Sequence, residues 1–439
     1  MAATTEQLNA HEAAIAGYRE YVTTSFVAAI EPVVVAKAEG ATIWDADGAE
    51  YVDCFAGISV VNAGHRHPKV IAAAKAQMDQ VVHAGSYIYH VPVVAEAAKE
   101  LARISPGALQ KTFFGNSGAE GIETAMRLAK AYTGKHEFIT LTHSFHGRTN
   151  ATLAITGNKA RKTRGGPYVS GISFAPAPYV YRNPFNTEDP DNVAQRCAEM
   201  VEWAINYQSS GDVAAFIAEP VMGEGGILVP PPNYFKYVKE VLDRHGILFI
   251  ADEVQSGFGR TGKMFAIEHY GVDPDIMVMA KGIADGFPLS ATIASAEIAD
   301  SLRPGEHLYT FGGNPVSCAA AVANIQVMEE ENLAAESARK GEYALDRLWE
   351  LQANNPMIGD VRGLGLMIGV ELVTDRKTKE PASKAAAGIR AYAREQGVLI
   401  GVGGQSGNVL RLQPPLVISD GALDRAIDVL TEGIKTAGS

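Results

Sequence analysis

Two apolar runs in the chain each end abruptly in a charged residue. Ile247–Ala251 is followed by Asp252, and Ile276–Ala280 is followed by Lys281. If both runs are strands of one parallel sheet, their carboxyl ends line a common crevice, which brings an acid and an amine together. A lysine in that place is costly to bury in its charged form, so it would lose its proton or form an imine. A neutral amine is a nucleophile towards an aldehyde.

Asp252 has a role that matches such an amine. A carboxylate beside a pyridine nitrogen keeps that nitrogen protonated, and a pyridinium ring is the electron sink on which pyridoxal phosphate (PLP) chemistry depends. The simpler alternative is that Asp252 and Lys281 form a structural ion pair.

A second motif could hold an anion. The segment Gly115–Glu120 follows a predicted strand, Lys111–Phe114, and opens a helix whose apolar positions include Ile122 and Met126. Small residues with free backbone N–H groups at the start of a helix form an anion site, and Ser117 adds a hydroxyl donor. A simple helix cap is the alternative, because Asn and Ser are common there.

A third motif, Ser144–Thr149, follows the predicted strand Phe138–Thr142. An aromatic side chain such as Phe145 can lie flat on a pyridine ring at the end of a strand. Arg148 can bind a carboxylate with its planar guanidinium. A loop with a packed phenylalanine and a surface arginine would have the same sequence.

Other motifs that could suggest chemistry fail on their details. The pairs His65/His67 and His143/His146 have no suitably spaced acid, so we expect no metal site. Gly257–Met264 resembles a nucleotide-binding P-loop, but Met264 stands where Ser or Thr must contact magnesium.

The elements that must position these residues follow an alternating pattern of short apolar runs and helices, which predicts an α/β fold with a mostly parallel sheet. The predicted strands of that sheet are Lys111–Phe114, Phe138–Thr142, Val213–Ala218, Ile247–Ala251, Ile276–Ala280 and Ser290–Ala294. We predict an N-terminal arm and part of a small domain in residues 1–60, a large domain in 61–325, and a smaller α+β domain in 326–439.

The flanking regions supply the smaller elements. In the arm, Ala41–Trp44 and Glu50–Asp53 surround a turn sequence and predict a hairpin. Near the C-terminus we expect a helix over Glu329–Ala353, a strand over Met367–Leu372 and a helix over Lys384–Gln396. A short strand and a final helix follow.

Composition excludes several classes of partner. The chain has 439 residues and a formal net charge of −12, so it repels phosphate backbones and nucleic acid is a poor partner. Its three cysteines are far apart, which argues against a disulfide scaffold. The first 20 residues lack the apolar segment of a secretory signal, and no apolar run approaches the roughly 20 residues of a membrane span. We therefore expect a cytoplasmic protein without a membrane partner.

Ten segments, taken in order, point to one family. They are Gly64–Pro68, Asn116–Glu120, Phe145–Thr149, Glu219–Gly226, Asp252–Gly262, Ala280–Gly282, Gly286–Ser290, Thr310–Pro315, Arg362–Leu366 and Arg411–Leu416. Over nearly its whole length the chain resembles the class III aminotransferases of PLP fold type I. This group includes 4-aminobutyrate, ornithine and amine:pyruvate aminotransferases.

The resemblance implies a cofactor site for PLP, with Lys281 as the Schiff-base lysine and proton shuttle and Asp252 beside the pyridine nitrogen. Gln255 would reach the ring hydroxyl, and Phe145 and Val254 would cover the two faces of the ring. The remaining cofactor-binding residues that it implies are Ser117, Gly118, Ala119, His146, Glu219 and Thr310. Thr310 would reach the phosphate of a neighbouring subunit, which implies a homodimer with active sites at the interface, or a tetramer built from such dimers.

The resemblance also implies a substrate site. Arg411 would bind the substrate carboxylate, and Glu224 would pair with Arg411 when no carboxylate is present. Arg148 and Ile58 match the 4-aminobutyrate enzymes, whereas Tyr87 would suit hydrophobic amines.

The expected function is therefore transfer of an amino group from an ω-amino acid or primary amine to a keto acid, pyruvate or 2-oxoglutarate, by a ping-pong mechanism like that of 4-aminobutyrate aminotransferases. A broad-specificity, (S)-selective amine:pyruvate or β-amino acid transaminase is the alternative. Two other classes of function are considered. One is another PLP reaction on the same fold, and the other is a binding protein that has kept the fold.

Overall fold

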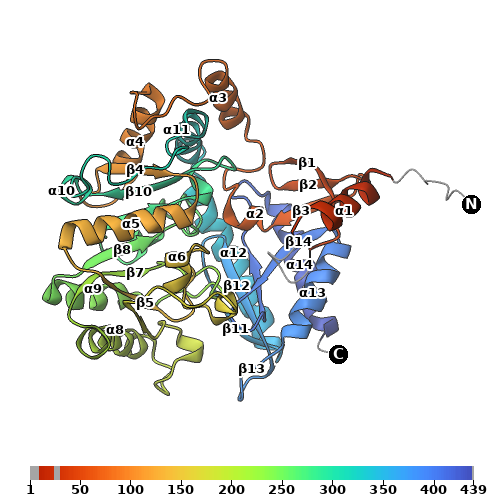
Figure 1. Ribbon diagram of the computed structural model, residues 1–439. Coiled ribbons are helices and arrows are strands. Elements are labelled where there is room, and N and C mark those ends of the chain that lie inside the picture. Colours follow the sequence, from red (N-terminus) through yellow and green to blue (C-terminus); the bar gives the residue numbers. More distant parts are fainter. Residues whose placement is uncertain (1–8, 24–29, 438–439) are drawn as a thin grey trace, which may run out of the picture.

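Two β-sheets with helices packed around them make up the computed structural model of the chain (Figure 1), which describes residues 9–23 and 30–437. Residues 1–8 and 24–29 belong to the arm predicted for residues 1–60 and lie outside the described residues.

The larger part of the chain is built on a seven-stranded sheet. In spatial order its strands are β4 (Lys111–Gly115), β10 (Ser290–Ala294), β9 (Ile276–Met279), β8 (Leu248–Asp252), β7 (Val213–Ala218), β5 (Glu137–Leu141) and β6 (Ile172–Ala175). From β9 to β6 the neighbours are parallel, and β10 is antiparallel to β4 and β9. This confirms the predicted α/β fold, with β6 as a strand that the sequence did not indicate.

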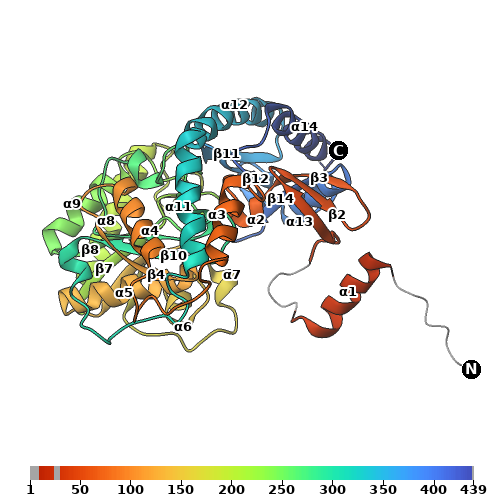
Figure 2. The same ribbon diagram turned by 90° about the horizontal axis from the view of Figure 1, so that it is seen from above.

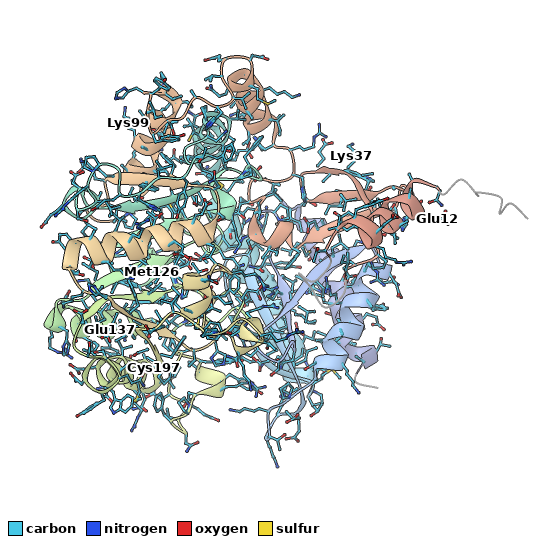
Figure 3. The ribbon with its side chains drawn as sticks, in the orientation of Figure 1. Glu12, Lys37, Lys99, Met126, Glu137 and Cys197 are labelled. Carbon is cyan, nitrogen blue, oxygen red and sulfur yellow. The ribbon has the colours of Figure 1, made fainter. Side chains whose placement is uncertain are left out.

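Both faces of this sheet are buried. Along β7, Phe216 and Ala218 belong to one apolar cluster, and Ala215 and Ile217 belong to the other. The first face is covered by α8 (Pro190–Tyr207) and α9 (Tyr234–His245), and the second by α5 (Gly118–Thr133). Cys197 on α8 and Met126 on α5 mark the two layers in Figure 3. Helices on both faces explain why these strands are apolar throughout rather than alternating.

The second sheet joins the two ends of the chain. Its strands, in spatial order, are β1 (Val35–Glu39), β2 (Thr42–Asp45), β3 (Glu50–Cys54), β14 (Val398–Gly403), β15 (Val409–Leu412), β12 (Met367–Asp375) and β11 (Ile358–Leu364), and β13 (Glu380–Pro381) pairs with β12. The predicted hairpin is confirmed as the antiparallel pair β2–β3. Because β3 pairs with β14, the N-terminal strands complete a sheet of C-terminal ones. The domain boundaries at residues 60 and 325 stay a prediction, which this sharing of strands supports.

Further helices surround the two sheets. They are α1 (Ala10–Tyr21), α2 (Ala56–Ser59), α3 (Pro68–Met78), α4 (Pro92–Ile104), α6 (Asn150–Ala154), α7 (Lys159–Lys162), α10 (Ala296–Ala299), α11 (Pro315–Glu330), α12 (Leu333–Asn354), α13 (Ser383–Glu395) and α14 (Asp420–Ala437). From above, α11 and α12 follow each other from the larger sheet to the smaller one (Figure 2). The helix predicted over Glu329–Ala353 starts later, at Leu333, because Asn332 has φ 51° and separates it from α11.

A buried ionic network joins the two sheets. Glu371 of β12 accepts hydrogen bonds from Tyr179 and, at 2.6 Å, from Arg182 Nε, both in the larger part of the chain. Arg362 of β11 donates to Glu371 at 2.9 Å and also to the carbonyl oxygen of Gly226. Burial alone would raise the pKa of Glu371, but the two guanidinium groups and the tyrosine hydroxyl hold it below its usual value. Glu371 therefore stays charged and fixes the loop that contains Gly226.

We expect Glu371→Ala to destabilise the fold by about 3 kcal/mol, because it removes the carboxylate from between two arginines in a buried site. The midpoint of urea-induced unfolding would fall accordingly. Glu342→Ala, at an exposed position on α12, is the matched control. An equal shift of the unfolding midpoint in both variants would show that the network contributes nothing to the stability of the fold.

No helix in the described part of the chain is long and apolar enough to cross a membrane.

Candidate active site

Asp252 and Lys281 lie at the carboxyl ends of the neighbouring parallel strands β8 and β9. Both line a cavity of about 350 Å³. Residues of the predicted segments around Ser117, Phe145 and Glu224 also line the cavity. The three motifs that the sequence predicted from separate places in the chain therefore meet in one pocket.

The Asp252 carboxylate is held in place by two groups behind it. His146 Nδ1 lies 2.7 Å from Asp252 Oδ2, and the backbone N–H of Val254 donates to Oδ1 at 3.0 Å. The other ring nitrogen of His146 lies 3.2 Å from the hydroxyl oxygen of Thr140. Because Asp252 is only 3% exposed, this chain of contacts fixes both the position of the carboxylate and the orientation of the imidazole.

Lys281 stands at the bottom of the cavity with a strained backbone. Its φ is 44°, a left-handed value that residues other than glycine seldom adopt. Burial lowers the pKa of Lys281, while the charges of Asp252 and Glu219 act in the opposite direction. Within the described residues no carboxylate lies within 4.0 Å of the Lys281 ammonium nitrogen. The described structure therefore has no direct ion pair between Asp252 and Lys281, although the charge of Asp252 still acts on the lysine.

The start of α5 forms an anion site opposite Lys281. Ser117 caps the helix, with its hydroxyl oxygen 3.3 Å from the backbone nitrogen of Glu120. The first N–H groups of a helix have no partner within it, and the helix dipole favours negative charge there. A Cβ at Gly118 would lie 2.8 Å from the Val254 side chain, so only glycine lets the helix approach the ring site so closely. This arrangement fits a phosphate group.

Glu219 connects two loops of the cavity. It accepts the backbone N–H of Phe145 at 2.9 Å and that of Gly223 at 2.9 Å. Burial raises the pKa of Glu219 above its usual value. At Gly223 a Cβ would fall 1.5 Å from Gln255 Oε1, so this glycine makes room for the Gln255 amide in the pocket.

Glu224, which lines the cavity, belongs to a cluster of three charged side chains. Glu224 Oε2 is 3.8 Å from Arg411 Nη1 and 3.1 Å from Arg161 Nη2. Burial would raise the pKa of Glu224, but the two arginines lower it below its usual value, so Glu224 is a carboxylate. Arg411 itself is 3% exposed and does not line the cavity. It is connected to the cavity through Glu224, which does line it.

Comparison with known proteins agrees with this geometry. The family model of the class III aminotransferases matches residues 26–434. A probable 4-aminobutyrate aminotransferase of Bacillus subtilis (strain 168) is 39% identical over 401 residues, which cover 91% of this chain and 92% of that protein. A leucine/methionine racemase of Thermococcus litoralis is 42% identical over 92% of this chain and 90% of its own length.

The chain belongs to the class III aminotransferases.

Members of this family use PLP, and the aminotransferase described here is therefore a PLP-dependent enzyme. A solved structure of an amine transaminase from an uncultivated Pseudomonas species, in a PLP-bound form, is similar to it. The TM-score is 0.89 at 33% identity, and the match covers 95% of this chain and 99% of that one. The residues of the cavity fit the cofactor, because an amine, a fixed carboxylate and the N-terminus of α5 line it.

Five residues that the sequence predicted for the aminotransferase site do not line this cavity in the described structure, and one of them is the buried Arg411 described above. Tyr87 and Thr310 are exposed and lie on the segments before α4 and before α11. Ile58, with φ 71°, is 36% exposed. The Arg148 guanidinium is exposed and lies 5.6 Å from the ring centroid of Phe145. Their roles in the aminotransferase stay predictions.

The sequence missed two residues that the aminotransferase places at the site. Thr140 supports His146, and Arg161 hydrogen-bonds Glu224 although 63 residues separate them. Neither has a local signal, because a threonine in a strand and an arginine in a basic loop are ordinary. The described residues contain no group of three or more His, Cys, Asp or Glu that could hold a metal ion.

Proposed function

We propose that this aminotransferase moves the amino group of an ω-amino acid or primary amine to a keto acid, pyruvate or 2-oxoglutarate, in the manner of a 4-aminobutyrate aminotransferase. The observation that carries the proposal is the buried Arg411 beside Glu224, which lines the Lys281 pocket. A cation that is offset by an acid can accept a substrate carboxylate in one half-reaction and leave the pocket neutral for an amine in the other.

The chain's own residues divide the chemistry among them. Bound PLP supplies an electron sink for the electrons released at the substrate carbon. Asp252, with His146 behind it, would lie next to the ring nitrogen and would hold a proton on that nitrogen. Lys281 would hold the cofactor at rest, and its amine would move the proton of the substrate during the reaction.

The two half-reactions would use one pocket in turn. The donor leaves as a carbonyl compound before the keto acid enters, so ping-pong kinetics are expected. Ser117, Gly118 and Ala119 would hold the phosphate, and Phe145 and Val254 would enclose the ring, because these residues line the cavity around Lys281. Gln255 would reach the ring hydroxyl.

Arg148 supports an ω-amino acid as donor. It is exposed and lies 5.6 Å from the ring centroid of Phe145, which lines the pocket, and its guanidinium would bind the distal carboxylate. Ile58 matches the same subgroup. The second candidate is a broad-specificity, (S)-selective amine:pyruvate or β-amino acid transaminase, with Tyr87 beside the bound amine. The similarity to an amine transaminase favours it.

A donor panel tests the proposal. 4-Aminobutyrate, β-alanine, ornithine, alanine and 1-phenylethylamine would each be combined with pyruvate and with 2-oxoglutarate. The proposal expects the highest kcat/KM for 4-aminobutyrate. Preference for 1-phenylethylamine would favour the second candidate. Product stereochemistry and pyridoxamine phosphate formation would separate both from a racemase, since racemisation of an amino acid leaves PLP unchanged.

Arg411→Ala is expected to raise KM for the keto acid by about 100-fold, because a charge-assisted bidentate contact of about 3 kcal/mol is lost. The KM for 1-phenylethylamine, which carries no carboxylate, would change by less than about 3-fold. Steady-state kinetics with each substrate varied in turn measures both values. Equal increases for the two substrates would remove Arg411 from the carboxylate-binding role.

We also propose that the enzyme is a homodimer in which Thr310 of the partner subunit completes the phosphate site. The segment next to Thr310 exposes apolar side chains, with Phe311 60% and Leu308 50% exposed. Leu308 and Tyr89, itself 65% exposed, line a common surface cavity. Exposed apolar surface of this kind is typical of a protein interface. Light scattering should give twice the chain mass, or four times for a tetramer built from two dimers, and a monomeric mass for the active enzyme would contradict the proposal. A cytoplasmic location stays a prediction.

A further inference from the structure

The carboxylate of Glu224 is bonded to a residue for which neither the motifs nor the proposed function provides a role. The two arginines approach the same oxygen, Oε2, at different distances: Arg161 Nη2 at 3.1 Å and Arg411 Nη1 at 3.8 Å. Only the shorter distance is a hydrogen bond. Glu224 is thus attached to Arg161, and its attraction to Arg411 acts through space.

Arg411, by contrast, makes few hydrogen bonds within the described residues. Its Nε and Nη1 atoms are buried and make no hydrogen bond within the described residues. Its Nη2 donates to the carbonyl oxygen of Val402 at 3.4 Å, and its guanidinium lies 5.4 Å from the Phe55 ring centroid. A buried guanidinium with unpaired N–H groups is costly unless an anion meets it. The arrangement leaves Arg411 ready for a carboxylate from outside the chain.

Arg161 is well placed to act as a fixed support. It lies on α7, whose N-cap residue Asn158 is 1% exposed and accepts the backbone N–H of Ala160 at 3.1 Å. The backbone N–H of Asn158 donates to the carbonyl oxygen of Ser144 at 3.0 Å, so α7 is tied to the loop that carries Phe145. The Arg161 side chain is 31% exposed and the Glu224 side chain only 13%. The pair therefore spans from the surface to the pocket.

Removal of Arg161 would let the Glu224 carboxylate move from its position on Arg161 to a position on Arg411. Without that hydrogen bond, Arg411 is the cation that remains next to the carboxylate, and a small shift would close the distance of 3.8 Å. A substrate carboxylate would then have to displace Glu224 before it could bind. The apparent affinity of a ligand falls by the fraction of protein in the competent state.

We propose that Arg161 is a positioning residue that holds Glu224 away from Arg411 and so keeps the carboxylate site of the enzyme open. This inference rests on the proposed function, in which Arg411 binds the carboxylate of the keto acid. It assigns Arg161 a part in choosing between substrates with a carboxylate at that position and substrates without one.

The experiment compares Arg161→Gln with the wild-type holoenzyme. We expect KM for the better keto acid, and the calorimetric Kd of the non-reacting dicarboxylate glutarate, to rise by about 10-fold, as expected for loss of one charge-assisted hydrogen bond. The KM for 1-phenylethylamine should stay within about 2-fold. Arg161→Lys should bind glutarate more tightly than Arg161→Gln, because a lysine restores part of the contact with Glu224. Lys159→Gln, at an exposed position on the same short helix, is the control for loss of one surface charge and should bind glutarate like the wild type.

A second background separates positioning from direct contact. In Glu224→Gln enzyme, whose neutral side chain is no rival for Arg411, Arg161→Gln should no longer weaken glutarate binding. An equal loss in both backgrounds would mean that Arg161 contacts the ligand itself, and unchanged glutarate binding in the single variant would also overturn the inference. Glutarate binding is independent of the donor panel, so a wrong donor assignment would leave this result standing. If Arg411→Ala left glutarate binding unchanged, the proposed carboxylate site itself would be wrong.

Discussion

Replacement of Lys281 by alanine is expected to reduce the transamination turnover by about 10⁴-fold or more. The variant loses both the amine that holds the cofactor and the base that moves the proton, and each of these contributes by several orders of magnitude. The strained backbone of Lys281, with φ 44°, and the charges of Asp252 and Glu224 that act on it support this role. Steady-state turnover with saturating donor and keto acid measures the effect.

A lysine in a different environment serves as the control. Lys340 is also buried, at 6% exposed, but its ammonium donates to the carbonyl oxygen of Leu416 outside the cavity. Lys340→Ala should lower stability and leave turnover within about 3-fold of the wild type. If Lys281→Ala kept a comparable turnover, another residue would be the base.

Asp252→Asn is expected to lower kcat by about 10²–10³-fold, the usual effect of removing a fixed electrostatic partner from an active site. The amide keeps the size of the side chain and can still contact His146, but it cannot hold a proton on the ring nitrogen through its charge. Stability should change little, so the variant separates charge from packing. Pre-steady-state measurement of the first half-reaction follows the step directly.

The neighbouring residue provides a matched control for the loss of a carboxylate. Glu253 is fully buried and bonds Ser256 and the backbone N–H of Ile267, away from the cavity. Burial raises the pKa of Glu253 to about 7, so the side chain carries about half a charge at neutral pH and Glu253→Gln removes that charge. The control should retain kcat. Similar losses in Asp252→Asn and Glu253→Gln would point to a general defect of β8 rather than to a cofactor partner.

Much of the fold could be predicted because the strands at its centre carry a strong signal. Val213–Ala218 and Ser290–Ala294 have the predicted bounds, since helices cover both faces and the runs are apolar throughout. Ile172–Ala175 was missed because it is a short strand at the sheet edge and three of its four residues are only partly buried. The pairing of β3 with β14 is equally invisible in sequence, because residues about 350 positions apart share no local pattern.

The candidate site divides in the same way. Asp252 and Lys281 were predictable, because each ends an apolar strand and the carboxyl ends of parallel strands meet. The Asp252–His146–Thr140 chain was not, since it depends on which side chains face each other behind the sheet. Arg161 was missed for a related reason, because its role exists only where α7 folds back on the Glu224 loop.

The central claim is that one amine, that of Lys281, holds the cofactor in a pocket built around it. Borohydride reduction of the purified holoenzyme, followed by protease digestion and mass spectrometry, tests it most directly. We predict about one reduced pyridoxyl phosphate group per chain, found on the peptide that contains Lys281. A label on any other lysine, or no label on a protein saturated with PLP, would contradict the assignment.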